Sequence, residues 1–116
     1  VDLPPGGNRF RARWTDVVDT TLCTTIGNQS GHRVATVEHL LSALSALGLD
    51  NATIELDGPE VPVMDGSAIP FVEALEKVGI ERLDALREVI VIRRRVRLQQ
   101  GASWAEFTPD AAQRVT

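Results

Sequence analysis

The sequence contains very little of what disulfide bonds and self-contained metal sites are made from. Its 116 residues include one cysteine, Cys23, and two histidines, His32 and His39. A single cysteine excludes an intrachain disulfide and a cysteine-rich zinc module, and it fits a reducing, cytoplasmic environment. A catalytic zinc generally takes three protein ligands. A zinc site that used one of these histidines would therefore need partners from outside this chain.

The sequence also lacks an excess of positive charge and any long hydrophobic run. Twelve Lys and Arg residues against sixteen Asp and Glu give a formal net charge of -4, which disfavours broad nucleic-acid binding. No apolar run approaches the ~20 residues that span a bilayer, and residues 1–20 lack the apolar core of a signal peptide. With 43% hydrophobic and 24% charged residues, the composition is typical of a soluble globular domain that has no integral membrane segment.

Local patterns predict both strands and helices. The first helix is expected to have Thr36 as its N-cap and to end at Gly48, and the second to have Ser67 as its N-cap and to end at Gly79. Alternating β-branched and apolar residues, with turn residues between them, predict the strands. We expect strands at 20–26, 52–56, 88–98 and 103–107, a hairpin return at 33–34, and an edge or loop segment at 61–63.

The longest predicted strand carries Arg93, Arg95 and Arg97 on one face. The simplest interpretation is a solvated strand surface, or a sheet edge that its charge protects from further pairing. A phosphate-binding role is the alternative. Because nothing else in the sequence supports nucleic-acid binding, we favour the solvated surface.

The first predicted helix has two distinct faces. Its apolar stripe consists of Val37, Leu40, Leu41, Leu44 and Leu47, and this stripe is expected to pack on the sheet. Glu38 and His39 project on either side of the opposite direction. The other residues of that opposite face, Ser42, Ala43, Ser45 and Ala46, are small and uncharged, which predicts that a second layer or domain packs closely against them. Glu38 and His39 would then lie in a cleft; simple surface positions are the alternative.

The position of this pair within the helix suits metal chemistry. Counting from Thr36, Glu38 is the second and His39 the third helical residue, where the helix dipole is positive and favours an ionised carboxylate and a neutral imidazole. A neutral imidazole can bind a metal, and the carboxylate beside it could activate water. A Glu-His dipeptide is too common to be specific. His32 is best interpreted as an exposed loop residue and Cys23 as a small buried strand residue.

Longer motifs are far more specific. T-V-E-H-L at 36–40 is followed by A-L-x-x-L-G-L-D-N, by V-P-V-M-D-G-S-A at 61–68 and by P-F-V at 70–72. In this order and spacing they closely resemble UDP-3-O-acyl-N-acetylglucosamine deacetylase, the zinc enzyme of the committed step of lipid A biosynthesis in Gram-negative bacteria. The resemblance runs from about residue 19 to about residue 107.

The resemblance implies an α+β fold. Members of this family have two similar domains, each a two-layer arrangement of a sheet and helices of the ribosomal protein S5 domain 2-like type, whose helix layers face each other around the zinc. Residues 1–86 would form most of the first domain without its opening strands. Residues 87–116 would form the first strands of the second domain.

The resemblance also assigns roles to single residues. His39 would bind zinc, and Glu38 would be the general base for the water that attacks the acetamide carbonyl of the substrate and releases acetate. Leu22 and Cys23 match a strand that borders the active site and would lie near the substrate. Thr36 would support the site structurally. Asp65 matches a position tied to activity, although an Asp-Gly turn explains it equally well.

The remaining zinc ligands and a catalytic histidine would lie in the second domain, outside this chain. The implied partners are the UDP-sugar substrate and that second domain of the same polypeptide, and the intact enzyme would be a monomer. The chain by itself would be inactive.

Two other functions stay open. A metal-dependent dehydratase, such as the imidazoleglycerol-phosphate type, is also built from duplicated α+β halves, but it would need more histidines than His32 can supply. A non-catalytic interaction module would present the small-residue helix face to a partner and would need no metal.

Overall fold

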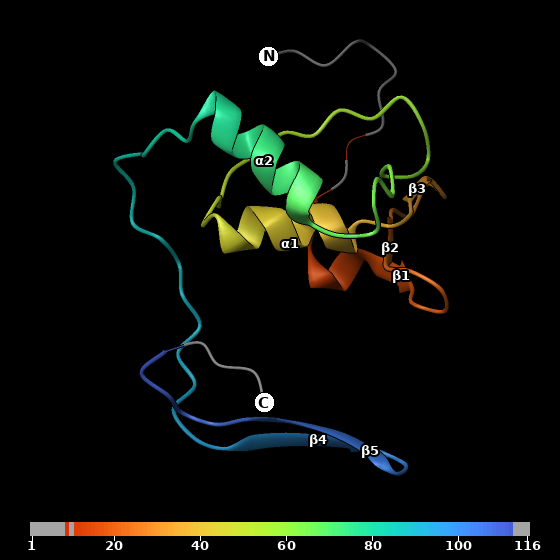
Figure 1. Ribbon diagram of the computed structural model, residues 1–116. Helices are drawn as coiled ribbons and strands as arrows, with labels where there is room; N and C mark the ends of the chain where they lie inside the picture. The colour runs from red at the N-terminus through yellow and green to blue at the C-terminus, as the bar shows by residue number, and fades with distance from the viewer. Residues whose placement is uncertain (1–8, 10, 113–116) are drawn as a thin grey trace. The chain divides into compact units, whose positions relative to one another are not determined.

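The computed structural model describes residues 9 and 11–112, and it has the expected mixed α+β class. The chain divides into two compact units, Val1–Leu83 and Asp84–Thr116 (Figure 1). Their correspondence to the first and second domains of a deacetylase stays a prediction.

The first unit begins with a short 3-10 helix, Trp14–Asp16, and a small antiparallel sheet in the order β1-β2-β3. The strands are β1 (Val17–Asp19), β2 (Thr25–Gly27) and β3 (Arg33–Val34). The predicted hairpin between β2 and β3 is confirmed, with Ile26 paired to Val34. The strand predicted over 20–26 is confirmed at 25–26 and wrong for 20–24, because the chain bends between β1 and β2: Asp19 Oδ1 accepts hydrogen bonds from both the N–H and the hydroxyl of Thr21. A short Asp side chain of this kind stabilises turns.

Helix α1 (Glu38–Ala46) starts later than its sequence predicts. Val37 is its N-cap, no side chain caps it, and Thr36 has a φ of 57°. The prediction of Thr36 as N-cap is therefore wrong, because Thr36 lies in the left-handed region and its hydroxyl donates to Glu60 instead of accepting from the first turn of the helix. The C-terminal end is as predicted: Gly48 has a φ of 69°. The Leu49 and Gly48 N–H groups donate to the carbonyls of Leu44 and Ser45, which is the Schellman pattern.

The left-handed conformation of Gly48 predicts that a side chain at this position lowers stability. Gly48→Ala is expected to lower the free energy of unfolding by about 1 kcal/mol, because an added Cβ is strained in the left-handed region. Gly58→Ala is the matched control, since Gly58 has open space around it and no left-handed φ. We would measure the urea midpoint of the purified whole protein; equal midpoints for the two variants would contradict the proposed strain.

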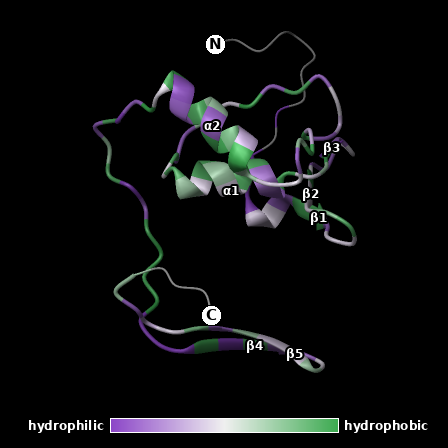
Figure 2. Ribbon diagram, in the orientation of Figure 1, coloured by the Kyte–Doolittle hydropathy of each residue, from purple (hydrophilic) through white to green (hydrophobic). Residues whose placement is uncertain are grey.

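A small apolar core holds the first unit together. Its buried residues are Ile26, Val37 and Val61, and partly buried side chains pack against them: Val34, Leu40, Leu41 and Phe71. Helix α2 (Ile69–Val78) contacts α1, and Figure 2 shows hydrophobic residues along both helices. The N-cap of α2 is Ala68 instead of the predicted Ser67, whose hydroxyl accepts a hydrogen bond from the Ile69 N–H. Through Leu40 and Leu41, which pack against the cluster that contains Ile26 of β2, the apolar stripe of α1 contacts the sheet as expected.

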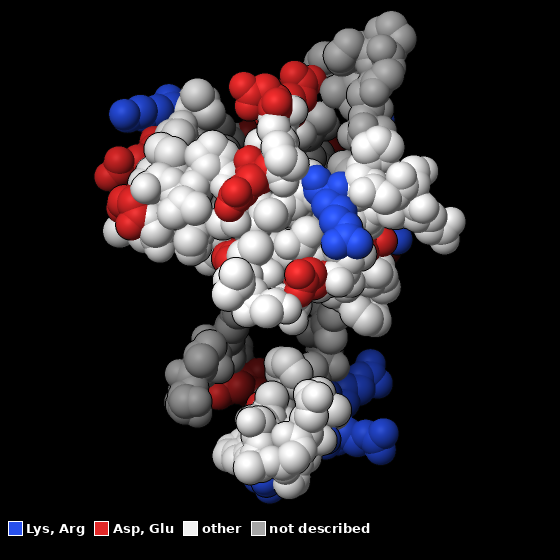
Figure 3. All heavy atoms as spheres, turned by 90° about the vertical axis from the view of Figure 1, so that its right-hand side faces the viewer, with Lys and Arg blue, Asp and Glu red and all other residues white. Residues whose placement is uncertain are grey.

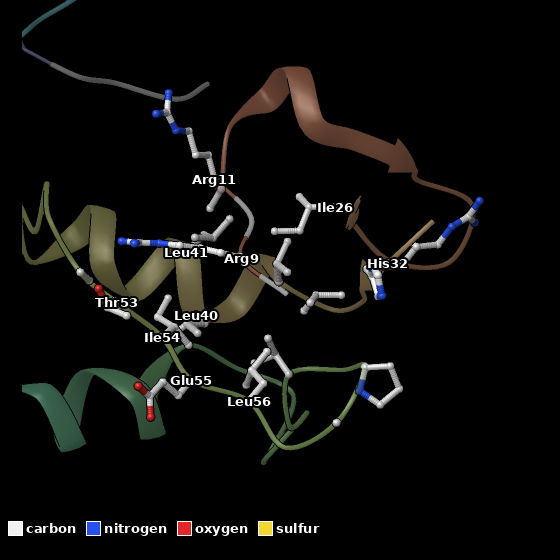
Figure 4. A pocket seen from close by; sticks show the side chains of 18 residues that line it. Arg9, Arg11, Ile26, His32, Leu40, Leu41, Thr53, Ile54, Glu55 and Leu56 are labelled. Atoms are coloured by element: carbon white, nitrogen blue, oxygen red, sulfur yellow. The ribbon is translucent and has the colours of Figure 1, made fainter. Parts of the chain in front are cut away.

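The predicted strand at 52–56 is wrong: this segment forms no strand, and no described residue pairs with it. An alternating pattern yields a strand only where a neighbouring strand offers hydrogen bonds. Ile54 and Leu56 are instead partly exposed along an open groove of about 1110 Å³. Figure 4 shows Leu40 and Leu41 of α1 among its lining side chains. Neither Glu38 nor His39 lines this groove, so it lies on the apolar side of α1.

The second unit contains one hairpin, β4 (Val96–Gln100) paired antiparallel with β5 (Ser103–Phe107). The pairing of these two segments is confirmed, but the strand predicted over 88–98 is wrong for 88–95, because β5 is long enough to pair only with 96–100. Basic side chains, blue in Figure 3, lie at the surface of this unit. Two arginines have partners within the hairpin. Arg95 pairs with Glu106 at 3.5 Å, and Arg97 lies 4.4 Å from the centre of the Trp104 ring. These contacts favour the solvated-strand interpretation.

Among the residues that the structure describes, no helix combines the length and the apolar character of a membrane span.

Candidate functional site

Glu38 is the first residue of α1, and the chain just before β2 fixes its carboxylate. Its Oε2 atom accepts a hydrogen bond from the Thr24 N–H at 3.0 Å. The Thr24 carbonyl in turn accepts from the Val37 N–H at 3.3 Å. The backbone of Thr24 therefore holds both the start of α1, at Val37, and the carboxylate of Glu38. The second carboxylate oxygen, Oε1, carries no hydrogen bond to a described residue and is the one that can act on a ligand.

His39 follows in the first turn, and one nitrogen of its ring needs a partner. The Nδ1 atom is buried and has no hydrogen bond within the described part of the chain. A ring nitrogen always offers either a donor or an acceptor, and leaving a buried one unpaired costs ~1–3 kcal/mol. A metal could bind Nδ1 and so give this nitrogen a partner. A metal could also bind the other ring nitrogen, and Nδ1–H would then donate a hydrogen bond to a further group. In either case the His39 imidazole fits the role of a metal ligand.

The described residues cannot complete a metal site. No group of three or more His, Cys, Asp or Glu side chains among residues 9 and 11–112 is arranged to hold a metal ion. His32 is exposed in the β2–β3 hairpin and lies along the apolar groove, which Glu38 and His39 do not line. That further ligands come from beyond these residues stays a prediction.

Cys23 lies close to Glu38, in the bend before β2. It is half-buried, and its Sγ is 3.7 Å from Thr25 Oγ1. Hydrogen bonding to Thr36, and then to Thr25, lowers the pKa of the thiol below its usual range, while burial and the negative charge of Glu38 oppose this shift. The expectation of a buried strand cysteine is thus wrong on both points. Its neighbour Leu22 is 97% exposed, and a substrate contact for either residue stays a prediction.

The lowered pKa of Cys23 predicts its reactivity. Because the thiolate is the reactive form, alkylation of Cys23 by iodoacetamide is expected to reach its half-maximal rate at a lower pH than that of an ordinary cysteine. Thr25→Val, which removes the hydroxyl 3.7 Å from Sγ, should move this midpoint upward, and Thr53→Val, in an exposed segment, should leave it unchanged. Mass spectrometry of the Cys23 peptide would follow the reaction. An unshifted midpoint in Thr25→Val would contradict the assigned cause.

Thr36 lies two residues before Glu38 and is buried, with 6% of its surface exposed. A β-branched residue in the left-handed region is rare and costs ~1–2 kcal/mol. Its hydroxyl donates to Glu60 Oε1 at 2.6 Å, a length typical of a charge-assisted hydrogen bond. The sequence analysis missed Glu60, because it follows a turn and belongs to no periodic pattern. The only sequence signal is its place in P-E-V-P-V, where it directly precedes the V-P-V-M-D-G-S-A motif at 61–68.

Asp65 makes the contacts of a turn residue. Its Oδ1 accepts hydrogen bonds from the Ser67 N–H at 2.9 Å and the Ser67 hydroxyl at 2.8 Å. These bonds lower the pKa of the carboxyl. Asp65 thus holds the turn before α2, and a role of this residue in activity stays a prediction.

Comparisons with known proteins show which family this sequence resembles. The model of the family described as "LpxC: UDP-3-O-acyl N-acetylglycosamine deacetylase" matches residues 1–116. A protein of Mannheimia succiniciproducens named UDP-3-O-acyl-N-acetylglucosamine deacetylase is 53% identical over 100 residues, which are 86% of this chain and 33% of that protein. A Vibrio cholerae protein of the same name is 51% identical over 100 residues, which are again 86% of this chain and 33% of that protein. A Shewanella loihica protein of that name is 48% identical over 109 residues, 94% of this chain and 35% of the relative.

The chain thus spans about a third of the length of the curated relatives it matches. The match covers both helices, both hairpins and the pair Glu38-His39. By sequence and by its α+β architecture, the chain belongs to the LpxC family of UDP-3-O-acyl-N-acetylglucosamine deacetylases.

Proposed function

We propose that the whole protein hydrolyses the acetamide of UDP-3-O-acyl-N-acetylglucosamine in a zinc-dependent reaction. It would act in lipid A biosynthesis in the cytoplasm of a Gram-negative bacterium. One observation in this chain carries the proposal: the first turn of α1 presents a carboxylate fixed by a backbone N–H next to an imidazole whose buried nitrogen is unpaired. The names of the relatives supply the substrate.

The residues of this chain would divide the chemistry between them. His39 would bind zinc together with ligands from the remainder of the whole protein, and zinc would supply Lewis acidity to the acetamide carbonyl. Glu38 would accept a proton from the attacking water, and Oε1 is the oxygen free to do so while Oε2 stays bonded to Thr24. The water oxygen bonds to the carbonyl carbon, the C–N bond breaks, and the nitrogen leaves as an amine once it has taken up a proton.

Two rival functions receive less support. A dehydratase would need clustered histidines, and the structure places His32 and His39 apart, on the β2–β3 hairpin and on α1. An interaction module would need no fixed carboxylate, whereas Glu38 is held on a main-chain donor. Of the small-residue face of α1, Ala43 is buried while Ser42, Ser45 and Ala46 are exposed. Its cover by a second domain stays a proposal.

Acetate release tests the proposal. The purified whole protein would be stripped with a chelator, reloaded with zinc, and assayed for acetate from the UDP-sugar. We expect activity to disappear with the metal and to return with it. Undiminished acetate release after chelation would contradict the zinc dependence, and no release in any state would contradict the reaction.

The chain of 116 residues by itself is expected to release no acetate and to bind zinc weakly. One ligand and one base do not close the coordination sphere of a catalytic zinc, because such a site takes three protein ligands. We would compare the chain with the whole protein by acetate assay and by zinc titration. Deacetylation by the chain at a rate near that of the whole protein would show that the described residues suffice.

A further inference from the structure

Thr36 has a backbone conformation that its own side chain opposes. Its φ of 57° lies in the left-handed region, which a β-branched residue rarely adopts. Such a conformation persists only where the surroundings fix it. Thr36 is also the second residue before Glu38, so the direction in which it turns the chain decides where α1 begins.

Glu60 supplies one of the contacts that fix Thr36. The Thr36 hydroxyl donates to Glu60 Oε1 at 2.6 Å. Glu60 itself is held by a parallel bridge to Ala35, in which the Ala35 N–H donates to the Pro59 carbonyl and the Val61 N–H donates to the Ala35 carbonyl. Val61 is buried in the core with 2% exposure. The carboxylate therefore projects from a segment that is anchored on both sides.

The opposite side of the turn is anchored on residue 24. The Val37 N–H donates to the Thr24 carbonyl, and the Thr24 N–H donates to Glu38 Oε2. The left-handed turn at Thr36 is what allows Val37 and Glu38 to meet the same backbone unit. If Thr36 relaxed to a negative φ, the first residue of α1 would move away from Thr24 and the Glu38 carboxylate would lose its fixed position.

We propose that Thr36 and Glu60 form a positioning pair that places the Glu38 carboxylate for proton transfer. This inference rests on the proposed deacetylase function and adds two residues to its machinery. Neither residue needs to touch the substrate. A misplacement of a reacting group by about 1 Å can lower a rate ~100-fold without weakening substrate binding, so the pair should affect kcat and leave KM alone.

The test uses five single variants of the zinc-loaded whole protein, one of them a control. Thr36→Val and Glu60→Leu each remove the hydrogen bond at nearly constant size, and both are expected to lower kcat about 10- to 100-fold with unchanged KM and zinc content. Thr36→Ser and Glu60→Gln keep a hydroxyl or an accepting oxygen, and both should stay within about threefold of the wild type. Glu55→Gln, at an exposed position of the same unit, is the control and should have no effect.

A double variant separates a pair from two independent effects. Because one hydrogen bond joins the two residues, Thr36→Val with Glu60→Leu should lose no more kcat than the more impaired single variant. A purely structural pair would lower the melting temperature of all the variants and leave kcat per zinc-loaded site unchanged. Such a result, or a product of the two single losses in the double variant, would overturn the proposal.

The failure of this inference differs from failure of the proposed function. If the wild type releases acetate and Glu38→Gln does not, while Thr36→Val and Glu60→Leu keep full kcat, the positioning pair is wrong and the deacetylase stands. If the wild type releases no acetate, or Glu38→Gln keeps full turnover, the proposed function fails and this inference fails with it. If Thr36→Val does not fold, the kcat of Glu60→Leu decides alone, because Glu60 is an exposed residue.

Discussion

Glu38→Gln is expected to lower kcat for acetate release by about 10²- to 10⁴-fold in the whole protein, the range that a general base contributes. Glutamine has the shape of glutamate and keeps an oxygen that can accept from the Thr24 N–H, so the start of α1 should be preserved. What glutamine cannot do is take a proton. KM and zinc content should therefore stay near the wild-type values, and the loss should appear in kcat alone.

Glu73→Gln is the matched control for this variant. Glu73 lies on the exposed side of α2, so its charge is lost without any effect on the site. Steady-state acetate assays and metal analysis of both variants would give the comparison. Turnover by Glu38→Gln within a few-fold of the wild type would remove Glu38 from the role of base.

His39→Ala is expected to reduce the zinc affinity of the whole protein by more than about 100-fold. Even a residue that only orients a metal ligand costs 10- to 100-fold when it is replaced, and loss of a ligand should cost more. The substitution also removes the buried Nδ1 that has no partner among the described residues, so the fold should not suffer from a lost internal hydrogen bond. Turnover at low zinc concentration should fall accordingly.

His32→Ala is the control for His39, because it removes the other histidine of the chain from an exposed hairpin. Its side chain takes no part in the hydrogen bonds of that turn, which Asn28 Oδ1 makes with the backbone of Ser30 and His32. Competition with a chromophoric chelator would measure zinc affinity. Equal affinities for His39→Ala and His32→Ala would show that His39 is not a ligand.

The sequence predicted those elements whose determinants are local. The apolar stripe of α1 and the glycine after its end act within a few residues, and both predictions are confirmed. The hairpin between β4 and β5 is likewise marked by neighbouring residues. Strands that depend on a distant partner were predicted poorly: the alternation at 52–56 is clear, but no described segment pairs with it.

The candidate site was predicted only in part, for a related reason. Glu38 and His39 are neighbours in sequence, and a family motif marks them. Thr36 was placed in the site but given the wrong conformation, since a threonine before a helix is typical of an N-cap and a β-branched residue rarely adopts the left-handed region. Glu60 was missed, because its contact with Thr36 joins residues 24 positions apart and no local pattern reports it.

The contact between Thr24 and Glu38 has a consequence for mutagenesis. The donor is a main-chain amide, so every amino acid except proline supplies it. A scan that exchanges side chains at position 24 would find tolerance there, and the position would be dismissed as neutral. Proline alone would expose the dependence, and so would replacement of the amide by an ester.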